Sequence, residues 1–477
     1  MSTSYELSEL ESWDARIREK VEEFGLTCFP QEFEICDHGQ MLGYMAYSGM
    51  PSHYPHWSYG KAYEKLKTLY DYGVSGLPYE MVINSSPSIA YLMRDNTLCL
   101  QILTMAHVYG HNDFFCNNFT FKSTRAEFTI GTFKANAERV RRYVEDPSIG
   151  IERVENILDA AHALSLQCRR NLGVRKRTQG EAQRDLLDAA RPPEDPFRSV
   201  HRRAEYELPD LRRVPAEPDE DILIFIRDHN PYLAEWEKDL LTIVHETAQY
   251  FIPQIETKIM NEGWASYWHK QILDSLELPQ DLQLEFIVRH NQVVRPHPGG
   301  LNPYHLGFKM WEDLRRRCED PTPEERADGA GERSGLGEMF LAREADRDVS
   351  FLRRHLTPRL MHEIDLFEYQ EKGDDLLVSS VSNEEGWRDV KETLLRNIGM
   401  ATVPSIAVHD ADFDGNRTLF LVHAYDGRDL QLEYAERTLG YIHRLWGRDS
   451  VLETFIGGKR THLVCNDRGF SSKTVKS

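Results

Sequence analysis

Residues 89–115 read IAYLMRDNTLCLQILTMAHVYGHNDFF, and this stretch decides the fold. Its apolar side chains occupy nearly every face at helical spacing, which is typical of a helix buried all round. Such a helix needs other elements packed on every side, so the stretch predicts a mainly helical domain with a large core. The polar residues inside it then need partners, because unpaired polar groups are costly to bury.

Helical spacing also occurs in segments before and after this stretch, and their charged positions alternate with apolar ones. Helices are expected over residues 5–25, 134–165, 240–251 and 257–273. Proline removes a backbone donor and clashes with the preceding turn, so Pro253 is expected to end the helix over 240–251.

Changes in composition along the chain suggest its domain organisation. Residues 167–220 are rich in Arg, Pro and acidic residues and are expected to form a linker or surface excursion. Residues 318–337 are polar and Gly-rich, which favours a flexible connection. Residues 405–430 contain two β-rich runs separated by a turn at 414–416, and a helical pattern follows over 434–447.

These patterns predict the α+β class. We expect a predominantly helical large domain over residues 1–370 and a small C-terminal α+β domain over residues 371–477.

The composition excludes some classes of function. The chain has 477 residues and a formal net charge of -20, which argues against a broad nucleic-acid surface. Its apolar runs are far shorter than the ~20 residues that span a bilayer, so no membrane association is expected. The acidic start of the chain does not resemble a secretory signal, and the seven cysteines form no C-x-x-C pair. A cytoplasmic location is expected.

His107 and His111 are the first candidates for metal ligands. They lie four residues apart in a predicted helix, so both imidazoles leave the same face. Two imidazoles at this spacing can chelate one divalent ion, with zinc favoured, and zinc then needs a further ligand such as a carboxylate. Glu262, in the apolar word NEGWASYWH, is the expected third ligand because a buried carboxylate needs a cation or a strong donor. The alternative is that these are core residues with ordinary hydrogen bonds.

A second pattern suggests hydrolytic chemistry. His245 and Glu246 begin the word H-E-x-x-Q, which is followed downstream by N-E-G-W-A and resembles the gluzincin peptidase plan without its last histidine. Glu246 is therefore the candidate general base. The remaining candidates for outer ligands or ligands of a second metal ion are Asp159, His162, His245 and His269.

Four polar residues outside these words are candidates for the wall of a substrate pocket, although each could equally close a turn: His56, Tyr59, Asn84 and Asn112. The sequence contains no phosphate-binding loop, dinucleotide fingerprint or G-x-S-x-G elbow. Nucleotide-driven chemistry and serine hydrolysis are therefore not expected.

The chain resembles the SpoVR family (stage V sporulation protein R and relatives) over most of its length. The resemblance rests on words in matching order: HWSYGK, YEMVINSSPSIAYLM, AHVYGHNDFFCNN, LDAAHAL, YFIPQIETKIMNEGWASYWH, NPYHLGFKMWEDLRRR and DVSFLRRHLTPRLM. It implies a large helical region followed by a smaller C-terminal region. It also implies a part in spore cortex formation in spore formers, and elsewhere a stress response with a PrkA-type serine kinase and a von Willebrand factor A-like protein. Arg is frequent in the family where His245 stands.

Two functional hypotheses follow. In the first, the protein binds a divalent metal ion through His107, His111 and Glu262 and hydrolyses an amide or peptide-like bond, with Glu246 as base. In the second, it is a non-enzymatic regulator or scaffold that acts with the kinase and its companion, and the polar core residues form hydrogen-bonded networks only.

Overall fold

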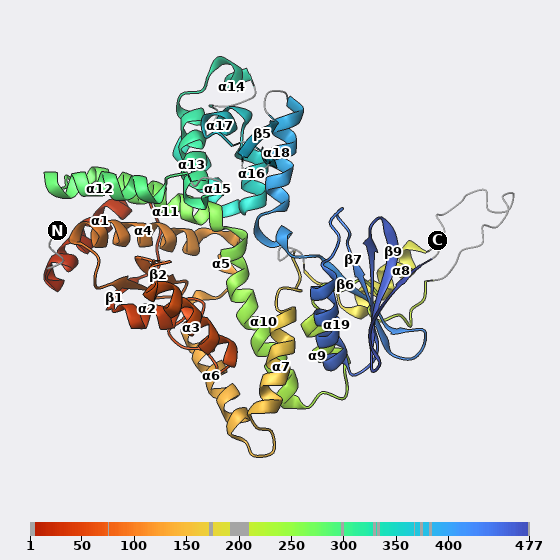
Figure 1. Cartoon of the computed structure of the whole chain (residues 1–477). Helices are drawn as coiled ribbons and strands as arrows, with labels where there is room; N and C mark the ends of the chain where they lie inside the picture. The colour runs from red at the N-terminus through yellow and green to blue at the C-terminus, as the bar shows by residue number, and fades with distance from the viewer. Residues whose placement is uncertain are drawn as a thin grey trace. The chain divides into compact units, whose positions relative to one another are not determined.

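The computed structural model describes residues 5–74, 76–170, 175–190, 209–296, 300–327, 331, 334–366, 368–372, 375–380 and 384–475 (Figure 1). Residue contacts divide the chain into two compact units: residues 1–141 with 249–402, and residues 142–248 with 403–477. This division differs from the sequence-based boundary near 370. Residues 384–402 stay with the first unit because α18 (Glu384–Arg396) packs on α16 (Asp348–His355).

Three helices form the centre of the first unit. They are α4 (Leu98–Asn117), α11 (Lys258–Ser275) and α13 (Pro303–Glu319), and α11 packs against both of the others. Almost every side chain of α4 is buried, as its unbroken apolar pattern predicted. The remaining elements of this unit are α1 (Leu7–Glu23), α2 (His38–Ala46), α3 (Trp57–Asp71), α5 (Phe119–Lys122), η1 (Ala126–Phe128), α6 (Thr129–Glu145), α12 (Gln280–Val293), α14 (Pro323–Ala327), α15 (Gly335–Ala345), α17 (Pro358–Glu363), η2 (Gly399–Thr402), β4 (Glu368–Lys372) and β5 (Asp375–Ser380).

The first part of residues 89–115 is a strand, so the prediction of one continuous helix there is wrong. β3 (Ser88–Met93) pairs in parallel with β1 (Gln31–Cys36) and antiparallel with β2 (Glu80–Ile83), in the order β1-β3-β2. A turn follows, and Thr97 caps α4 by accepting a hydrogen bond from the backbone N–H of Leu100. Periodicity alone does not separate a fully buried strand from a buried helix, which is why the boundary was missed.

Two other helix predictions need correction. α10 (Glu235–Glu256) continues through Pro253, so the prediction that this proline ends the helix is wrong by three residues. A single proline removes one backbone N–H donor. The other backbone hydrogen bonds are enough for the helix to continue to Glu256. The predicted helix over 134–165 is two helices, α6 and α7 (Ile151–Leu164), which are separated at Gly150 with φ of 78°.

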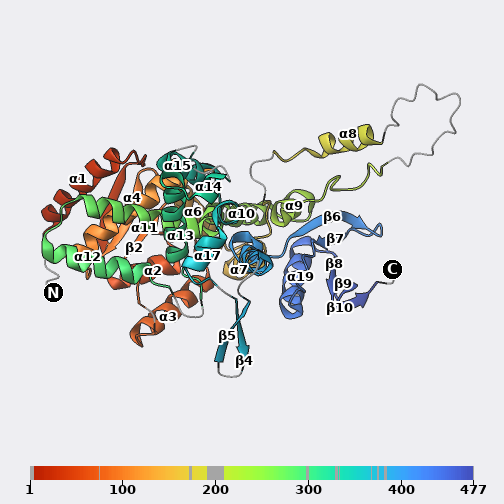
Figure 2. The ribbon, with the colours of Figure 1, turned by 90° about the horizontal axis from the view of Figure 1, so that it is seen from above.

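The second unit contains a five-stranded sheet in the order β10-β9-β8-β7-β6, with α19 (Leu432–Trp446) packed on it (Figure 2). Its strands are β6 (Ile406–Phe413), β7 (Thr418–His423), β8 (Ser450–Ile456), β9 (Lys459–Asn466) and β10 (Gly469–Thr474). The parallel pair β7 and β8 is connected by α19, and the other neighbouring strands are antiparallel. The predicted pair of β-rich runs, turn and helix is confirmed, and with it the α+β class.

Residues 167–220 contribute structure to this unit as well. They contain α8 (Gln179–Ala189), and backbone hydrogen bonds join Asp219 to Val408 and Val214 to Ala411 along the edge of β6. α9 (Ile222–His229) follows directly. Parts of both predicted linkers, residues 171–174, 191–208, 328–330 and 332–333, lie outside the described residues. In the portion of the chain that the structure describes, no helix is both long and apolar enough to cross a membrane.

Candidate metal centre

The site lies in the first unit, where α4, α11 and strand β2 meet. α11 approaches α13 very closely, because a Cβ atom on Gly263 would lie 2.3 Å from the carbonyl carbon of Gly307. Only glycine at both positions permits this contact. The position of α11 fixes Glu262, the neighbour of Gly263, on the side that faces α4.

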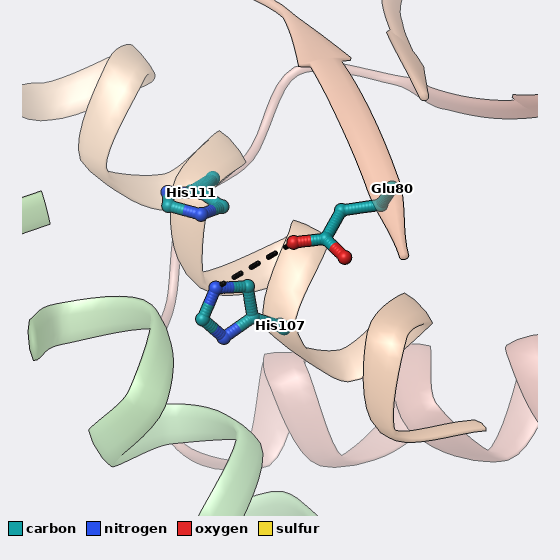
Figure 3. A group of neighbouring side chains, drawn as sticks. All are labelled: Glu80, His107 and His111. Carbon is teal, nitrogen blue, oxygen red and sulfur yellow. Dashed lines mark ion pairs between the residues drawn. The ribbon is translucent and has the colours of Figure 1, made fainter. Parts of the chain in front are cut away.

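Glu80, His107 and His111 form a group of potential metal ligands. One ligand atom from each lies within 4.8 Å of the other two. Figure 3 shows both imidazoles extending from one helix and the carboxylate reaching them from a strand. The side chains of His107 and His111 are 4% and 6% exposed, whereas those of Glu80 and Glu262 are 18% and 19% exposed, so solvent reaches the group on the side of its two carboxylates.

Glu262 joins this group from α11. Its Oε2 atom lies 3.8 Å from His107 Nε2 and 3.4 Å from His111 Nε2, and Glu80 Oε1 lies 3.9 Å from His107 Nε2. These separations between Nε2 and carboxylate oxygen are longer than most N–H···O hydrogen bonds. Two ligand atoms at ~2.0–2.1 Å from a tetrahedral zinc ion lie about 3.3 Å apart, so the spacing suits ligands around an ion.

One oxygen of this site lacks a hydrogen bond. Glu262 Oε2 is buried and has no hydrogen-bond partner among the described residues. A buried carboxylate oxygen without a donor is costly, and a cation at the centre of the group would satisfy it. Glu80, His107 and His111, with Glu262 3.4 Å from His111, therefore offer the nitrogen and carboxylate donors that a divalent cation accepts.

The outward-facing nitrogens of both histidines have hydrogen-bond partners. His111 Nδ1 lies 2.8 Å from Asn261 Oδ1, and His107 Nδ1 lies 2.9 Å from His269 Nδ1. His269 Nε2 continues the chain to His290 Nδ1 at 2.7 Å. Because an amide oxygen only accepts, His111 Nδ1 carries the proton and its Nε2 lone pair points toward the centre. Metal-binding histidines have this arrangement of outer partners.

Burial keeps the imidazole of His111 in its neutral form. Burial and the charge of His107 together lower the pKa of His111 to about 4, against the opposing effects of Glu262 and Asn261. Burial also lowers the pKa of His269 well below its ordinary value, and that of His290 to about 4. Neutral imidazole is the form that binds a metal ion.

The acidic groups of the site respond to the same surroundings. Burial raises the pKa of Glu80, and His107 opposes this rise. Tyr304 lies beside the carboxylates, since the charge of Glu262, burial and the charge of Glu80 together raise its pKa. Its ring also stacks on His107 with 6.2 Å between centroids. A hydroxyl donor therefore lies next to the potential metal ligands.

The structure brings together His107, His111 and Glu262, the three ligands predicted from the sequence, and places His269 directly behind His107. It adds Glu80, Asn261, His290 and Tyr304, which the sequence analysis did not select. Glu80 stands in the word YEMVINSSPS, where an acidic residue among apolar strand residues was a usable signal. The other three carry no comparable signal, because their roles depend on contacts across helices.

The other predicted ligands and the predicted base belong to the second unit. Glu246 is exposed on α10, and His245 Nε2 pairs with Asp221 Oδ2 at 2.7 Å. Asp159 and His162 lie on α7. The group formed by Glu80, His107 and His111 includes none of these four residues.

The four predicted pocket residues lie in the first unit, in local hydrogen-bonded structure. His56 caps α3 by accepting a hydrogen bond from the backbone N–H of Ser58. The Tyr59 hydroxyl lies 3.2 Å from Nε2 of His53. Asn84 donates to Thr124 Oγ1 at 2.7 Å. Asn112 clamps α4 to the start of β1, because it accepts from the N–H of Phe29 and donates to its carbonyl.

Comparison with known proteins gives the same family over both units. A family described as "SpoVR like protein" matches residues 4–403, and a family described as "SpoVR-like C-terminal domain" matches residues 404–456. The chain is 34% identical over 474 residues to a protein of Escherichia coli (strain K12) called "Uncharacterized protein YcgB", with 93% of this chain and 91% of that protein covered. No solved structure matches the chain.

Proposed function

The chain belongs to the SpoVR family, and from the geometry of its buried histidine and carboxylate group we propose that it binds one divalent metal ion, with zinc favoured. His107, His111 and Glu262 would hold the ion, and Glu80 would stand beside it. The finer part of the proposal is that the protein hydrolyses an amide or peptide-like bond at this ion.

One observation carries the metal-binding part of the proposal. Glu262 Oε2 is buried, has no hydrogen-bond partner in the part of the chain that the structure describes, and faces two Nε2 atoms at 3.4 and 3.8 Å. Its partner His111 has its proton on the opposite nitrogen, so no N–H from His111 reaches this oxygen. A lone pair and an anionic oxygen directed at one point need a cation between them. Two imidazoles and one or two carboxylates are a donor set that zinc accepts.

The arrangement of the side chains supports hydrolysis. A zinc ion held there would supply a Lewis acid for a substrate carbonyl and for the water that attacks it. Glu80 would take a proton from that water, since its Oε1 atom lies 3.9 Å from His107 Nε2 and Glu262 serves as the ligand. Tyr304 can donate a hydrogen bond to an oxygen that develops negative charge. Glu246 is not used in this proposal, since it is exposed on α10.

Two conservative variants test the proposal. Glu262→Gln removes the charge of a proposed ligand, whereas Glu80→Gln removes the charge of the proposed base. With zinc-loaded protein and a quenched-fluorescent peptide library, we expect Glu80→Gln to keep zinc and lose most peptide cleavage, and Glu262→Gln to lose zinc. Wild-type protein that binds zinc and cleaves no peptide would contradict the hydrolase part alone. A wild type that binds no zinc would contradict the whole proposal.

The kinase and the von Willebrand factor A-like protein expected as partners, and the expected roles in sporulation or stress, stay predictions. These predictions concern partners and cellular role, whereas the proposal above concerns metal binding.

A further inference from the structure

A basic pocket lies between α11, α12 and α13 in the first unit. Its volume is about 500 Å³, and its polar lining includes Lys270, His290, Arg295, His305, Lys309 and Glu312. This volume is within the range of small-molecule sites. The lining contains three residues with full positive charge and one acidic residue. Lys270 pairs with Asp274 at 2.7 Å and Lys309 pairs with Glu312 at 2.9 Å, so the positive charge beyond these pairs comes from Arg295. Such a local excess of positive charge favours an anionic ligand.

The pocket also contains an unsatisfied nitrogen. His305 Nδ1 lies 2.8 Å from the carbonyl oxygen of Val294, so this nitrogen carries a proton. His305 Nε2 is buried and lacks a hydrogen-bond partner within the described parts of the chain. A ligand that offers a hydroxyl, such as a phosphate with one proton, would satisfy it.

A chain of histidines connects this pocket with the metal centre. His107 Nδ1 contacts His269 Nδ1, and His269 Nε2 contacts His290 Nδ1. His290 lines the pocket, and its Nε2 is the ring nitrogen left for a ligand. Each ring is neutral when it holds one proton, so the position of the proton on one ring dictates its position on the next.

The hydrogen bonds along this row of histidines can run in either of two directions, and metal binding selects one of them. An ion on His107 Nε2 needs the lone pair there, which places the proton on Nδ1. His107 then donates to His269, His269 donates to His290, and His290 Nε2 carries a proton toward the pocket. In the opposite direction, His290 Nε2 would be an acceptor and would repel an anion.

We infer that this pocket binds a small oxyanion of the phosphate class, and that a metal ion on His107 strengthens the binding by turning His290 into a hydrogen-bond donor. The inference rests on the proposed function for its metal-dependent part. The pocket itself depends on its own residues: Arg295 is exposed, and Lys309 also reaches Glu312 at 2.9 Å, so both cations are near the ligand space without being buried.

Calorimetric titration with inorganic phosphate tests the inference, at constant ionic strength because salt screens exposed charges. The proteins are wild type with and without zinc, the double variant Arg295→Gln/Lys309→Gln, and Lys65→Gln, which removes an exposed lysine on α3 as a matched control. We expect zinc-loaded wild type to bind one phosphate. The double variant should bind it about tenfold or more weakly, and the control within about twofold of wild type. Removal of zinc should weaken binding about fivefold or more.

Each comparison in this experiment can overturn a separate part of the inference. Equal phosphate affinity in the double variant would overturn the pocket and would place phosphate elsewhere, for example on the metal ion. Equal affinity with and without zinc, in protein that binds zinc, would overturn the histidine link. Protein that takes up no zinc would overturn the proposed function together with that link. The comparison of the double variant with the Lys65→Gln control would then still show whether the pocket binds phosphate.

Discussion

Gly110 lies directly against Ala265, since a Cβ atom on Gly110 would come within 2.6 Å of the Ala265 Cα atom. Gly110 stands on α4 between His107 and His111, and Ala265 stands on α11 three residues after Glu262. This close approach of the two helices lets short imidazole and carboxylate side chains meet at one point. Glycine at position 110 therefore supports the geometry of the proposed metal centre even though it offers no ligand.

Gly110→Ala should disturb the metal centre and the core together. The added methyl group must push α4 and α11 apart, and overpacking of this kind costs about 1–3 kcal/mol of unfolding free energy. We expect zinc affinity to fall at least about tenfold, measured by competition with a chromophoric chelator. Gly131→Ala on α6 is the control, because a Cβ there meets no atom of the described residues within 4 Å. A folded Gly110→Ala protein with wild-type zinc affinity would contradict the helix-contact explanation.

Asn261→Leu should weaken metal binding through His111. The variant removes the oxygen that accepts from His111 Nδ1 and leaves the ring free to rotate. Loss of such an outer partner typically costs about 10–100-fold in metal affinity. The zinc titration of this variant is compared with that of Asn397→Leu, which changes an exposed asparagine. Similar zinc affinities in the two variants would show that Asn261 does not orient His111.

Metal-free protein should lose stability as the pH falls from about 6.5 to about 4. His111 and His290 have pKa values of about 4 in the folded chain and ordinary values near 6.5 when unfolded. The unfolded state binds more protons in this window, so the stabilisation present above pH 6.5 is lost as the pH falls through the folded pKa. The loss is at most about 3 kcal/mol for each histidine.

Urea unfolding at several pH values measures this loss, and His290→Asn should reduce its slope. In NMR titrations of the metal-free protein, the ring signal of His111 should change with a midpoint near pH 4. A midpoint near 6.5 would show that the fold does not lower the pKa of the His111 ring.

Asp113→Ala should destabilise the first unit strongly. Asp113 is fully buried and accepts hydrogen bonds from Arg343, Trp264 Nε1 and the N–H of Thr27. Removing it leaves the buried guanidinium of Arg343 with only the exposed Glu344 as an ion-pair partner. Loss of a buried partner costs about 3–5 kcal/mol. Chemical denaturation should show this loss, whereas Arg437→Ala, in an exposed pair on α19, should cost less than about 1 kcal/mol. A loss below about 1 kcal/mol for Asp113→Ala would mean that water reaches this pair.

The sequence predicted the grouping of His107, His111 and Glu262 better than it predicted the surroundings of these side chains. His107 and His111 share one face of a single helix, so local spacing was enough to pair them. Glu262 was found because a carboxylate in an apolar helix needs a partner. Glu80 and His290 reach the site from a strand and another helix, and only the packing of those elements on α4 reveals them.

For the fold, the sequence correctly gave the class and the buried character of α4 and α11. It did not give the strand over Ser88–Met93, because a buried strand and a buried helix have the same apolar composition. It also did not show that residues 142–248 join the C-terminal sheet. That association depends on pairing between distant segments, such as Asp219 with Val408, which periodicity does not record.

The metal content of the purified protein tests the central claim most directly. Untagged protein is purified without chelators, and its zinc, iron and manganese are measured by elemental analysis. Wild type is compared with His107→Ala/His111→Ala and with the control His38→Ala/His362→Ala, which changes two exposed histidines. We predict about one metal ion per chain in the wild type and the control, and loss of that ion in the folded His107→Ala/His111→Ala protein. Metal-free wild type that also fails to take up added zinc, or equal metal in all three proteins, would contradict the account.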